Sequence, residues 1–182
     1  MKNLVVAMTA LVLLAGCAHP TQNSATTETT ALKAPITCEL PVVIAAFNAQ
    51  VAGSTYVPTD WQPSPGTDLF DAIQNGGIAC TYGIQVAEIG GTLMWANDVN
   101  GLWAKKKAQW LKAGQLQIDL PGIDETDATI LKEGSTGADE MHVWGVNLLY
   151  KGVWIQVNAS FLQNVEEALP IIQSAIGSLN SN

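Results

Sequence analysis

Hydrophobic and polar residues follow three different patterns along this chain of 182 residues. An apolar run over 4–14 is followed by a stretch rich in Thr, Ser, Asn and Gln that extends to about residue 35. Beyond it, apolar residues recur at the spacings typical of helices and strands. These patterns predict a signal peptide over 1–16, a flexible tether over 17–35 and a single folded domain over 36–182.

Periodicity and capping residues predict four helices and five strands in the domain. The expected helices cover 40–51, 67–74, a segment from the caps Asn97, Asp98 or Asn100 to Ala113, and the segment after Asn164. The expected strands cover 78–86, 92–96, 116–120, 140–150 and 153–160, with turns at Gly90-Gly91 and Lys151-Gly152. This order indicates an α+β fold, in which an antiparallel sheet of about five strands has the helices packed on one face.

The residues that close the apolar run, Leu14-Ala15-Gly16-Cys17, resemble the lipobox of a bacterial lipoprotein. The run is about a dozen residues long, whereas a helix needs roughly 20 to span a bilayer, so a cleaved signal peptide fits better than a retained anchor. The resemblance implies cleavage before Cys17 and attachment of acyl chains, such as palmitate, at that cysteine. The mature chain is then expected on the extracytoplasmic side of the cell membrane, or on an outer membrane if the cell has two.

The charge balance of the chain is acidic, with a formal net charge of −8 and no arginine. Removal of residues 1–16 would take away Lys2 and no carboxylate, leaving seven lysines against sixteen carboxylates. Nucleic-acid binding requires a basic surface that neutralises phosphates, usually one rich in arginine. We therefore expect no nucleic-acid partner.

With Cys17 lipidated, two cysteines are left, Cys38 and Cys80. Disulfides persist outside the cytoplasm, so these two are expected to pair and close a loop of about 40 residues. The alternative is a pair of free thiols that serve metal or redox chemistry. It lacks a CxxC motif and a nearby histidine.

Aromatic residues suggest where a ligand would bind. Tyr56 and Trp61 lie between Pro58, Pro63 and Pro65 in a segment that predicts an ordered irregular loop. Together with Trp144 and Trp154 of the last two expected strands, Tyr56 and Trp61 are candidates for the lining of a ligand pocket. The alternative is that the loop aromatics only cap the core.

The third expected helix concentrates half of the eight lysines around two tryptophans. Trp103, Lys105, Lys106, Lys107 and Trp110 are the composition expected of a surface that lies on a membrane interface. The alternative is that Trp103 and Trp110 face the core while the lysines form an ordinary solvated face.

No catalytic motif is present, so the chain is expected not to be an enzyme and to need no cofactor. His142, the only histidine of the domain, has no recognisable nucleophile motif beside it. The carboxylates Asp119, Asp124, Glu125, Asp127 and Glu133 lack the spacing of a calcium-binding EF-hand loop. A solvated acidic loop, with no metal, is the better interpretation of this cluster.

In overall plan the chain resembles the small secreted lipoproteins of actinobacterial type, whose function is unknown and which are similar to the extracellular sensor domain of certain receptor kinases. The resemblance rests on the lipobox, on Cys38-x-Leu40 at the start of an early helix, on Ile78-Ala79-Cys80-Thr81-Tyr82, and on the final hairpin and helix. It covers most of the domain.

Two functions follow from these patterns. Six tryptophans are more than a core of this size needs, and ligand sites are usually aromatic-lined concavities. The first hypothesis is therefore a non-catalytic domain that binds or senses an envelope ligand, such as a lipid, a glycan or a small apolar molecule. The alternative is an interaction module that docks another envelope protein through an exposed apolar patch.

Overall fold

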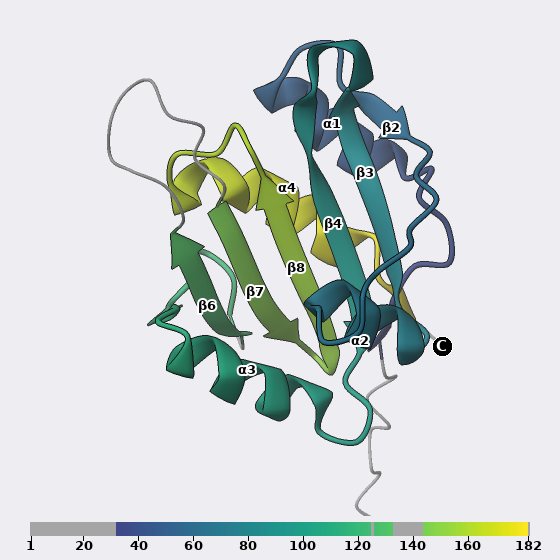
Figure 1. Cartoon of the computed structure of the whole chain (residues 1–182). Coiled ribbons are helices and arrows are strands. Elements are labelled where there is room, and N and C mark those ends of the chain that lie inside the picture. The colour runs from purple at the N-terminus through teal and green to yellow at the C-terminus, as the bar shows by residue number, and fades with distance from the viewer. Residues whose placement is uncertain (1–31, 125, 133–143, 182) are drawn as a thin grey trace, which may run out of the picture.

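The computed structural model describes residues 32–124, 126–132 and 144–181 (Figure 1). Cys17, Glu125, Glu133 and His142 lie outside the described residues. The centre of the domain is a sheet of seven strands, and all neighbouring strands are antiparallel. In spatial order the strands are β2 (Thr55–Val57), β3 (Ile78–Ile84), β4 (Ile89–Asn97), β8 (Val153–Ala159), β7 (Trp144–Tyr150), β6 (Thr126–Lys132) and β5 (Leu116–Ile118).

The antiparallel sheet with helices confirms the expected α+β fold, but the sheet has seven strands rather than about five. Strand β2 has only three residues, too few to show an alternating pattern, and it lies among the prolines of the aromatic loop. Strand β6 begins within the acidic stretch that was expected to be a solvated loop. It is a strand because its residues at alternate positions, Ala128 and Ile130, are buried in the core.

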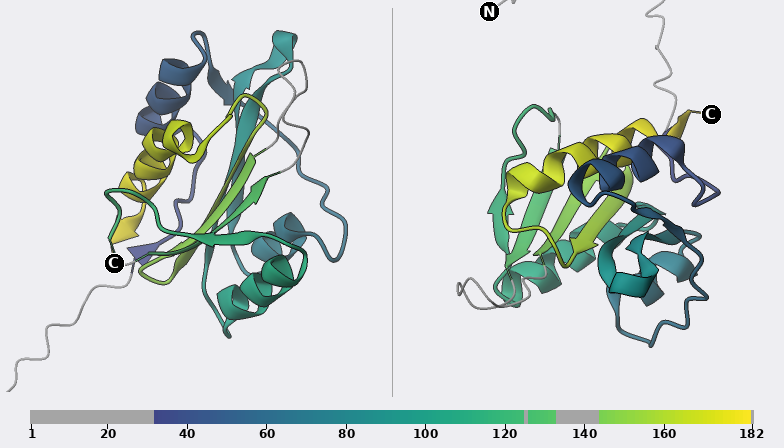
Figure 2. Two further views of the ribbon diagram at one scale, coloured as in Figure 1. Left: turned by 90° about the vertical axis from the view of Figure 1, so that its left-hand side faces the viewer. Right: turned by 90° about the horizontal axis from the view of Figure 1, so that it is seen from above.

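Helices cover both faces of the sheet, so the expectation that they lie on one face is wrong. Helices α1 (Pro41–Gln50) and α4 (Val165–Gly177) pack together on one face, called here the back face. Helices α2 (Asp68–Gln74) and α3 (Leu102–Lys112) lie on the opposite front face (Figure 2). Strand β4 shows the reason. Its successive residues Met94 and Trp95 are both buried but point to opposite faces, so each face needs a cover.

The larger part of the core lies between the back face and helices α1 and α4. The final hairpin contributes to it as alternation predicts, because Val146 and Leu148 face the same side as Ile155 and Val157. Trp95 also faces this side, and its indole Nε1 donates a hydrogen bond of 3.1 Å to the Ala175 carbonyl of α4. This hydrogen bond satisfies the one polar group of a fully buried side chain.

The turn of the β3–β4 hairpin differs from the expectation, because Gly90 and Gly91 continue strand β4. The chain reverses instead at a short 3₁₀ turn, η1 (Gln85–Ala87), followed by Glu88 in the left-handed conformation. A Cβ atom on Gly90 would lie 2.5 Å from the Tyr82 carbonyl oxygen. The two strands approach each other so closely at Gly90 that only a glycine fits. A glycine can therefore mark a close approach of two strands as well as a turn.

The expected disulfide is confirmed. Cys38, which precedes α1, is bonded to Cys80 of strand β3, with the two Cα atoms 5.4 Å apart. The bond ties the segment before α1 to strand β3, which is next to the edge strand β2 of the sheet.

The two ends of the described chain lie together, because β1 (Leu32–Lys33) pairs with β9 (Asn180–Ser181). Strand β1 thus lies within the stretch over 17–35 that was expected to be a flexible tether. The backbone N–H of Ala34 donates to Asn97 Oδ1, at the far end of β4 from the hairpin turn. The start of the described chain is thus at the opposite end of β4 from the hairpin tip. Among the described helices, none has the length and apolarity that crossing a bilayer requires.

Candidate functional site

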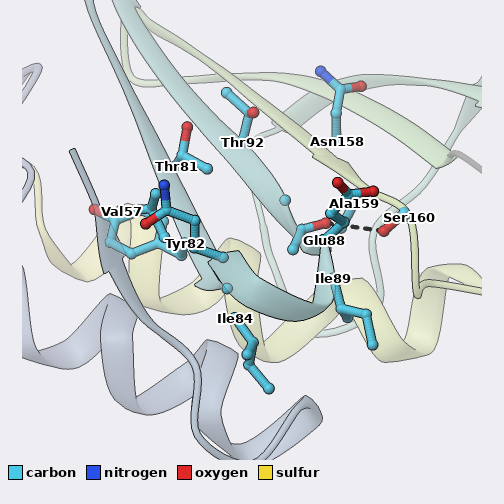
Figure 3. Close-up of a pocket in the computed structure, with 14 residues that line it drawn as sticks. Val57, Thr81, Tyr82, Ile84, Glu88, Ile89, Thr92, Asn158, Ala159 and Ser160 are labelled. Carbon is cyan, nitrogen blue, oxygen red and sulfur yellow. Dashed lines mark hydrogen bonds between the residues drawn. The ribbon is translucent and has the colours of Figure 1, made fainter. Parts of the chain in front are cut away.

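The described helices cover only half of the front face of the sheet. Helices α2 and α3 lie over one end of it, and none of the described helices covers the end near the β3–β4 hairpin tip (Figure 1). A row of residues from neighbouring strands crosses this open half, and we call it the open row: Thr81, Thr92, Asn158, Gly145 and Leu131. Thr81, Thr92 and Asn158 project side by side from the sheet (Figure 3). The open row therefore presents hydroxyl and amide groups to the solvent.

Two cavities adjoin along the open row. The first, called the hairpin cavity, has a volume of about 350 Å³, and its lining includes Val57, Thr81 and Thr92. This volume is within the range of roughly 300–1,000 Å³ that is usual for small-molecule sites. The side chains of Ile84 and Ile89 point to the other side of the sheet from Thr81 and Thr92 (Figure 3). The second, called the amide cavity, has a volume of about 210 Å³ and lies over β8, β7 and β6. Asn158 lines both cavities and joins them.

The amide cavity is lined mainly by polar side chains, and a hydrogen-bond network holds several of them. Gln156 Nε2 donates to Asp68 Oδ2 at 3.1 Å and to Asn147 Oδ1 at 2.8 Å. Asn158 Nδ2 donates to Gln156 Oε1 at 3.0 Å. The buried indole of Trp154 donates to Asn147 Oδ1 at 3.0 Å from beneath the cavity floor. Each amide is thereby held in one orientation before any ligand arrives.

Asp68, at the start of α2, anchors the network electrostatically. Lys106 Nζ of α3 lies 2.6 Å from Asp68 Oδ1 and 2.8 Å from Asp71 Oδ2. Trp110 Nε1 donates to Asp68 Oδ2 at 2.8 Å. Lys106 is only 2% exposed, and this burial alone would lower its pKa. The hydrogen bonds and negative charges of the two aspartates outweigh burial and hold the pKa of Lys106 above its ordinary value, so the lysine stays charged.

A second branch of the network reaches toward the β5 side of the sheet. Asn147 Nδ2 donates to Gln115 Oε1 at 3.3 Å, and Thr129 Oγ1 donates to the same oxygen at 3.0 Å. Asn147 and Thr129 are almost completely buried. Buried polar residues of this kind are costly unless they are hydrogen-bonded, and here the network satisfies them.

Three of the four aromatic residues that were expected to line a pocket pack elsewhere in the structure. Trp154 is completely buried under α3, and Trp61 packs partly buried over the same core and donates from Nε1 to the Ala79 carbonyl at 2.9 Å. The ring of Tyr56 packs beside that of Tyr82, with the centroids 6.1 Å apart. None of these three lines the hairpin or the amide cavity. The side chain of Trp144 lies outside the described residues.

The residues expected to form a membrane surface are largely internal. Trp103 and Trp110 are buried against the front face, with ring centroids 5.3 Å apart, and Lys106 is buried in its ion pairs. Lys107 is partly buried and pairs with Asp127, while Lys105 is exposed. The alternative, in which both tryptophans face the core, describes Trp103 and Trp110 correctly. Neither interpretation anticipated a buried lysine.

The expected acidic loop divides into separate environments. Asp127 is in strand β6, where it accepts hydrogen bonds from Lys107 Nζ at 2.5 Å and from Trp103 Nε1 at 2.8 Å. Burial alone would raise the pKa of Asp127, but these two partners hold it below its ordinary value. Asp119 and Asp124 are exposed. Within 32–124, 126–132 and 144–181, no cluster of three or more His, Cys, Asp or Glu residues is placed to hold a metal ion.

A third cavity, of about 440 Å³, lies between α4 and the turn of the final hairpin. Its lining includes the exposed residues Gly122, Asp124, Lys151 and Gln173. Exposed side chains of this kind are not held in one orientation, so this cavity lacks the fixed polar groups of the amide cavity.

Sequence reasoning missed the residues that build the amide cavity. Gln156 and Asn158 follow Trp154 by two and four residues in the expected strand 153–160, so they share its strand face, and this was the available signal. Two polar residues that share a strand face with a tryptophan indicate either a solvated face or a polar site. No protein-family model matches the chain, and the searches of curated proteins and of solved structures return no match.

Proposed function

We propose that this chain is a lipid-anchored extracytoplasmic lipoprotein whose domain binds an envelope ligand, without catalysis, on the open half of the sheet. The observation that carries the proposal is the pair of cavities joined at Asn158 over a floor of amide groups that are already hydrogen-bonded. A site whose polar groups are fixed in advance loses little conformational entropy when a ligand binds.

The position of the tether supports this assignment. The chain joins the domain at the end where Ala34 contacts Asn97, whereas the hairpin cavity lies at the opposite end of β4. Strand β4 has nine residues, which at about 3.3 Å per residue separates the two ends by roughly 30 Å. A lipid attached at Cys17 would thus leave the cavities facing away from the attached end and open to envelope components.

The proposed function is tested by filling the hairpin cavity. Thr92 lines this cavity and is only partly exposed, so Thr92→Trp should occupy its space without a change in charge. Ala108→Trp is the matched control, because Ala108 is exposed on α3 and lines neither cavity. Each variant, carrying Cys17→Ser, is incubated with an envelope extract, and bound small molecules are released with organic solvent and identified by mass spectrometry.

We expect a compound enriched by the parent chain and by Ala108→Trp, and lost with Thr92→Trp. Equal recovery from all three proteins, or no enriched compound from any of them, contradicts ligand binding at the open half.

Docking to another envelope protein is the second candidate, and one observation favours it. Val86 at the hairpin tip is 96% exposed, and the neighbouring Ile89 is also exposed. Val86→Asp should abolish a docking contact, because an aspartate would have to be desolvated in the interface. Crosslinking in intact cells would then show a partner for the parent chain that is absent for Val86→Asp, whereas the binding function predicts the same crosslinks for both.

A further inference from the structure

The hydrogen-bond network under the amide cavity has a direction that is set by its two fixed ends. An indole N–H can only donate, so Asn147 must turn its Oδ1 toward Trp154. An ionised carboxylate can only accept, so Gln156 must turn its Nε2 toward Asp68. The orientation of both amides therefore follows from chemistry.

The groups that face the cavity follow from these orientations. With Gln156 Nε2 engaged, its Oε1 accepts from Asn158 Nδ2, so Asn158 must direct its own Oδ1 away from Gln156. An ideal Cβ placed on Gly145 would lie 2.7 Å from this Oδ1, so the absence of a side chain at Gly145 makes room for it. On the other branch, Gln115 Oε1 already accepts two hydrogen bonds, which leaves the Gln115 amide nitrogen as its group for a ligand. The cavity thus offers a fixed acceptor and a fixed donor.

The described lining of the cavity offers no free charge to a ligand. Asp68 is the only charged residue among the described lining residues, and its two oxygens already contact Lys106, Trp110 and Gln156. Recognition of a phosphate or carboxylate uses arginine or lysine, and the described lining contains neither. An apolar ligand would instead cover amide groups without replacing their water, at a cost of roughly 1–3 kcal/mol for each group left unpaired. The lining therefore selects a neutral ligand that both donates and accepts hydrogen bonds.

A peptide has these groups too, but the position of the cavity disfavours it. Peptides bind to sheets by pairing with the backbone of an edge strand. The amide cavity lies over β8, β7 and β6, and each of these strands is already paired with a neighbour on both sides. Recognition here must come from side chains alone, which suits the hydroxyl groups of a sugar ring.

We infer that the amide cavity binds a neutral sugar residue of an envelope glycan. The hairpin cavity, with Val57 and Gly90 in its lining, takes a small apolar substituent of the same ligand, such as an acetyl group. This inference rests on the proposed function and names the ligand class of the same site. Hydroxyl groups meet the acceptor of Asn158 and the donor of Gln115 at the same time, because each hydroxyl can donate and accept.

The experiment is a titration of the ¹⁵N-labelled mature chain, carrying Cys17→Ser, followed by NMR of side-chain amides. The probes are the trimer of N-acetylglucosamine, maltotriose, laurate and trialanine. We expect saturable shifts of the Asn158 and Gln115 amide signals with at least one of the two neutral saccharides. Gly145→Ala should weaken that binding about tenfold, because its Cβ displaces Asn158 Oδ1 and one hydrogen bond is lost.

Gly177→Ala is the matched control, because a Cβ at Gly177 meets no atom within 4 Å, and it should bind as the parent does. Asn158→Ala removes the same contact without adding volume and provides the second test variant. If neither saccharide causes saturable shifts up to about 10 mM, where even a Kd near 1 mM would give saturation, the inference is overturned. If laurate or trialanine then shifts the NMR signals of the open row, the sugar inference is overturned while the proposed ligand-binding function is retained. If no probe causes a shift, both the inference and the proposed function are contradicted.

Discussion

Replacement of Lys106 by methionine is the perturbation that best tests how the site is held. Methionine keeps most of the length of the side chain but leaves Asp68 and Asp71 without their cation, 2.6 Å and 2.8 Å from the missing Nζ. Removing one partner of a buried ion pair costs roughly 3–5 kcal/mol. The two aspartate side chains are 26% and 29% exposed, so water can partly replace the ammonium group. We therefore expect the free energy of unfolding to decrease by about 3 kcal/mol, near the lower end of this range.

The assay is urea unfolding followed by tryptophan fluorescence, with the disulfide intact. In thermal unfolding of a domain of this size, a decrease of about 3 kcal/mol in the free energy of unfolding corresponds to a decrease in Tm of roughly 6–12 °C. Lys105→Met is the matched control, since Lys105 is exposed on the same helix, and it should change the free energy of unfolding by less than about 0.5 kcal/mol. If the free energies of unfolding of Lys106→Met and Lys105→Met differ by less than about 0.5 kcal/mol, the ion pairs of Lys106 do not stabilise the domain and the reasoning is refuted.

The pH dependence of this effect has a defined sign. The pKa of Lys106 is raised in the folded state, so the stability it contributes is fully present below the ordinary lysine pKa of about 10.4. This contribution is lost only as the pH rises through the higher folded pKa. The difference between parent and Lys106→Met should thus be constant from about pH 6 to pH 9 and decrease only in strong alkali.

Three further predictions concern other parts of the chain. Replacing Cys38 and Cys80 by serine should lower the free energy of unfolding by about 4 kcal/mol for a loop closed across 42 residues, and an unchanged urea midpoint would contradict this. Asp127, whose pKa is lowered, contributes stability that is present above about pH 4 and lost as the pH falls through the folded pKa. Asp127→Asn should therefore reduce the fall in the free energy of unfolding as the pH is lowered below about 4. An unchanged fall would show that the ion pair of Asp127 with Lys107 does not cause it. Cys17→Ser should abolish incorporation of labelled palmitate and release the chain from the membrane fraction, so persistent labelling would exclude lipidation at Cys17.

Local patterns predicted the elements whose determinants are local. The helices expected over 67–74 and after Asn164 are present, and each has a side-chain cap: the Thr67 hydroxyl accepts from the Phe70 N–H and Asn164 Oδ1 accepts from the Glu167 N–H. The final hairpin follows from alternation and from the Lys151-Gly152 turn, both of which are visible within a few residues. Capping and alternation act over one turn or one strand, so a single sequence shows them.

The site depends on contacts that no local pattern reveals. Gln156 and Asp68 are separated by 88 residues, and Lys106 and Asp71 by 35. The Lys-rich helix suggested a solvated or membrane-facing surface because a buried lysine is rare and its two aspartates lie on another helix. The second helical layer was missed for the same reason. Only the assembled sheet shows that its front face carries Met94 and Trp154 and needs a cover.

The central claim, that the domain holds a ligand on the open half of the sheet, is tested most directly by native mass spectrometry of the chain purified gently from the envelope of its own source. The account predicts an added mass that organic solvent removes and that is absent from Thr92→Trp purified in the same way. A bare chain, or an adduct that Thr92→Trp retains in full, would contradict it.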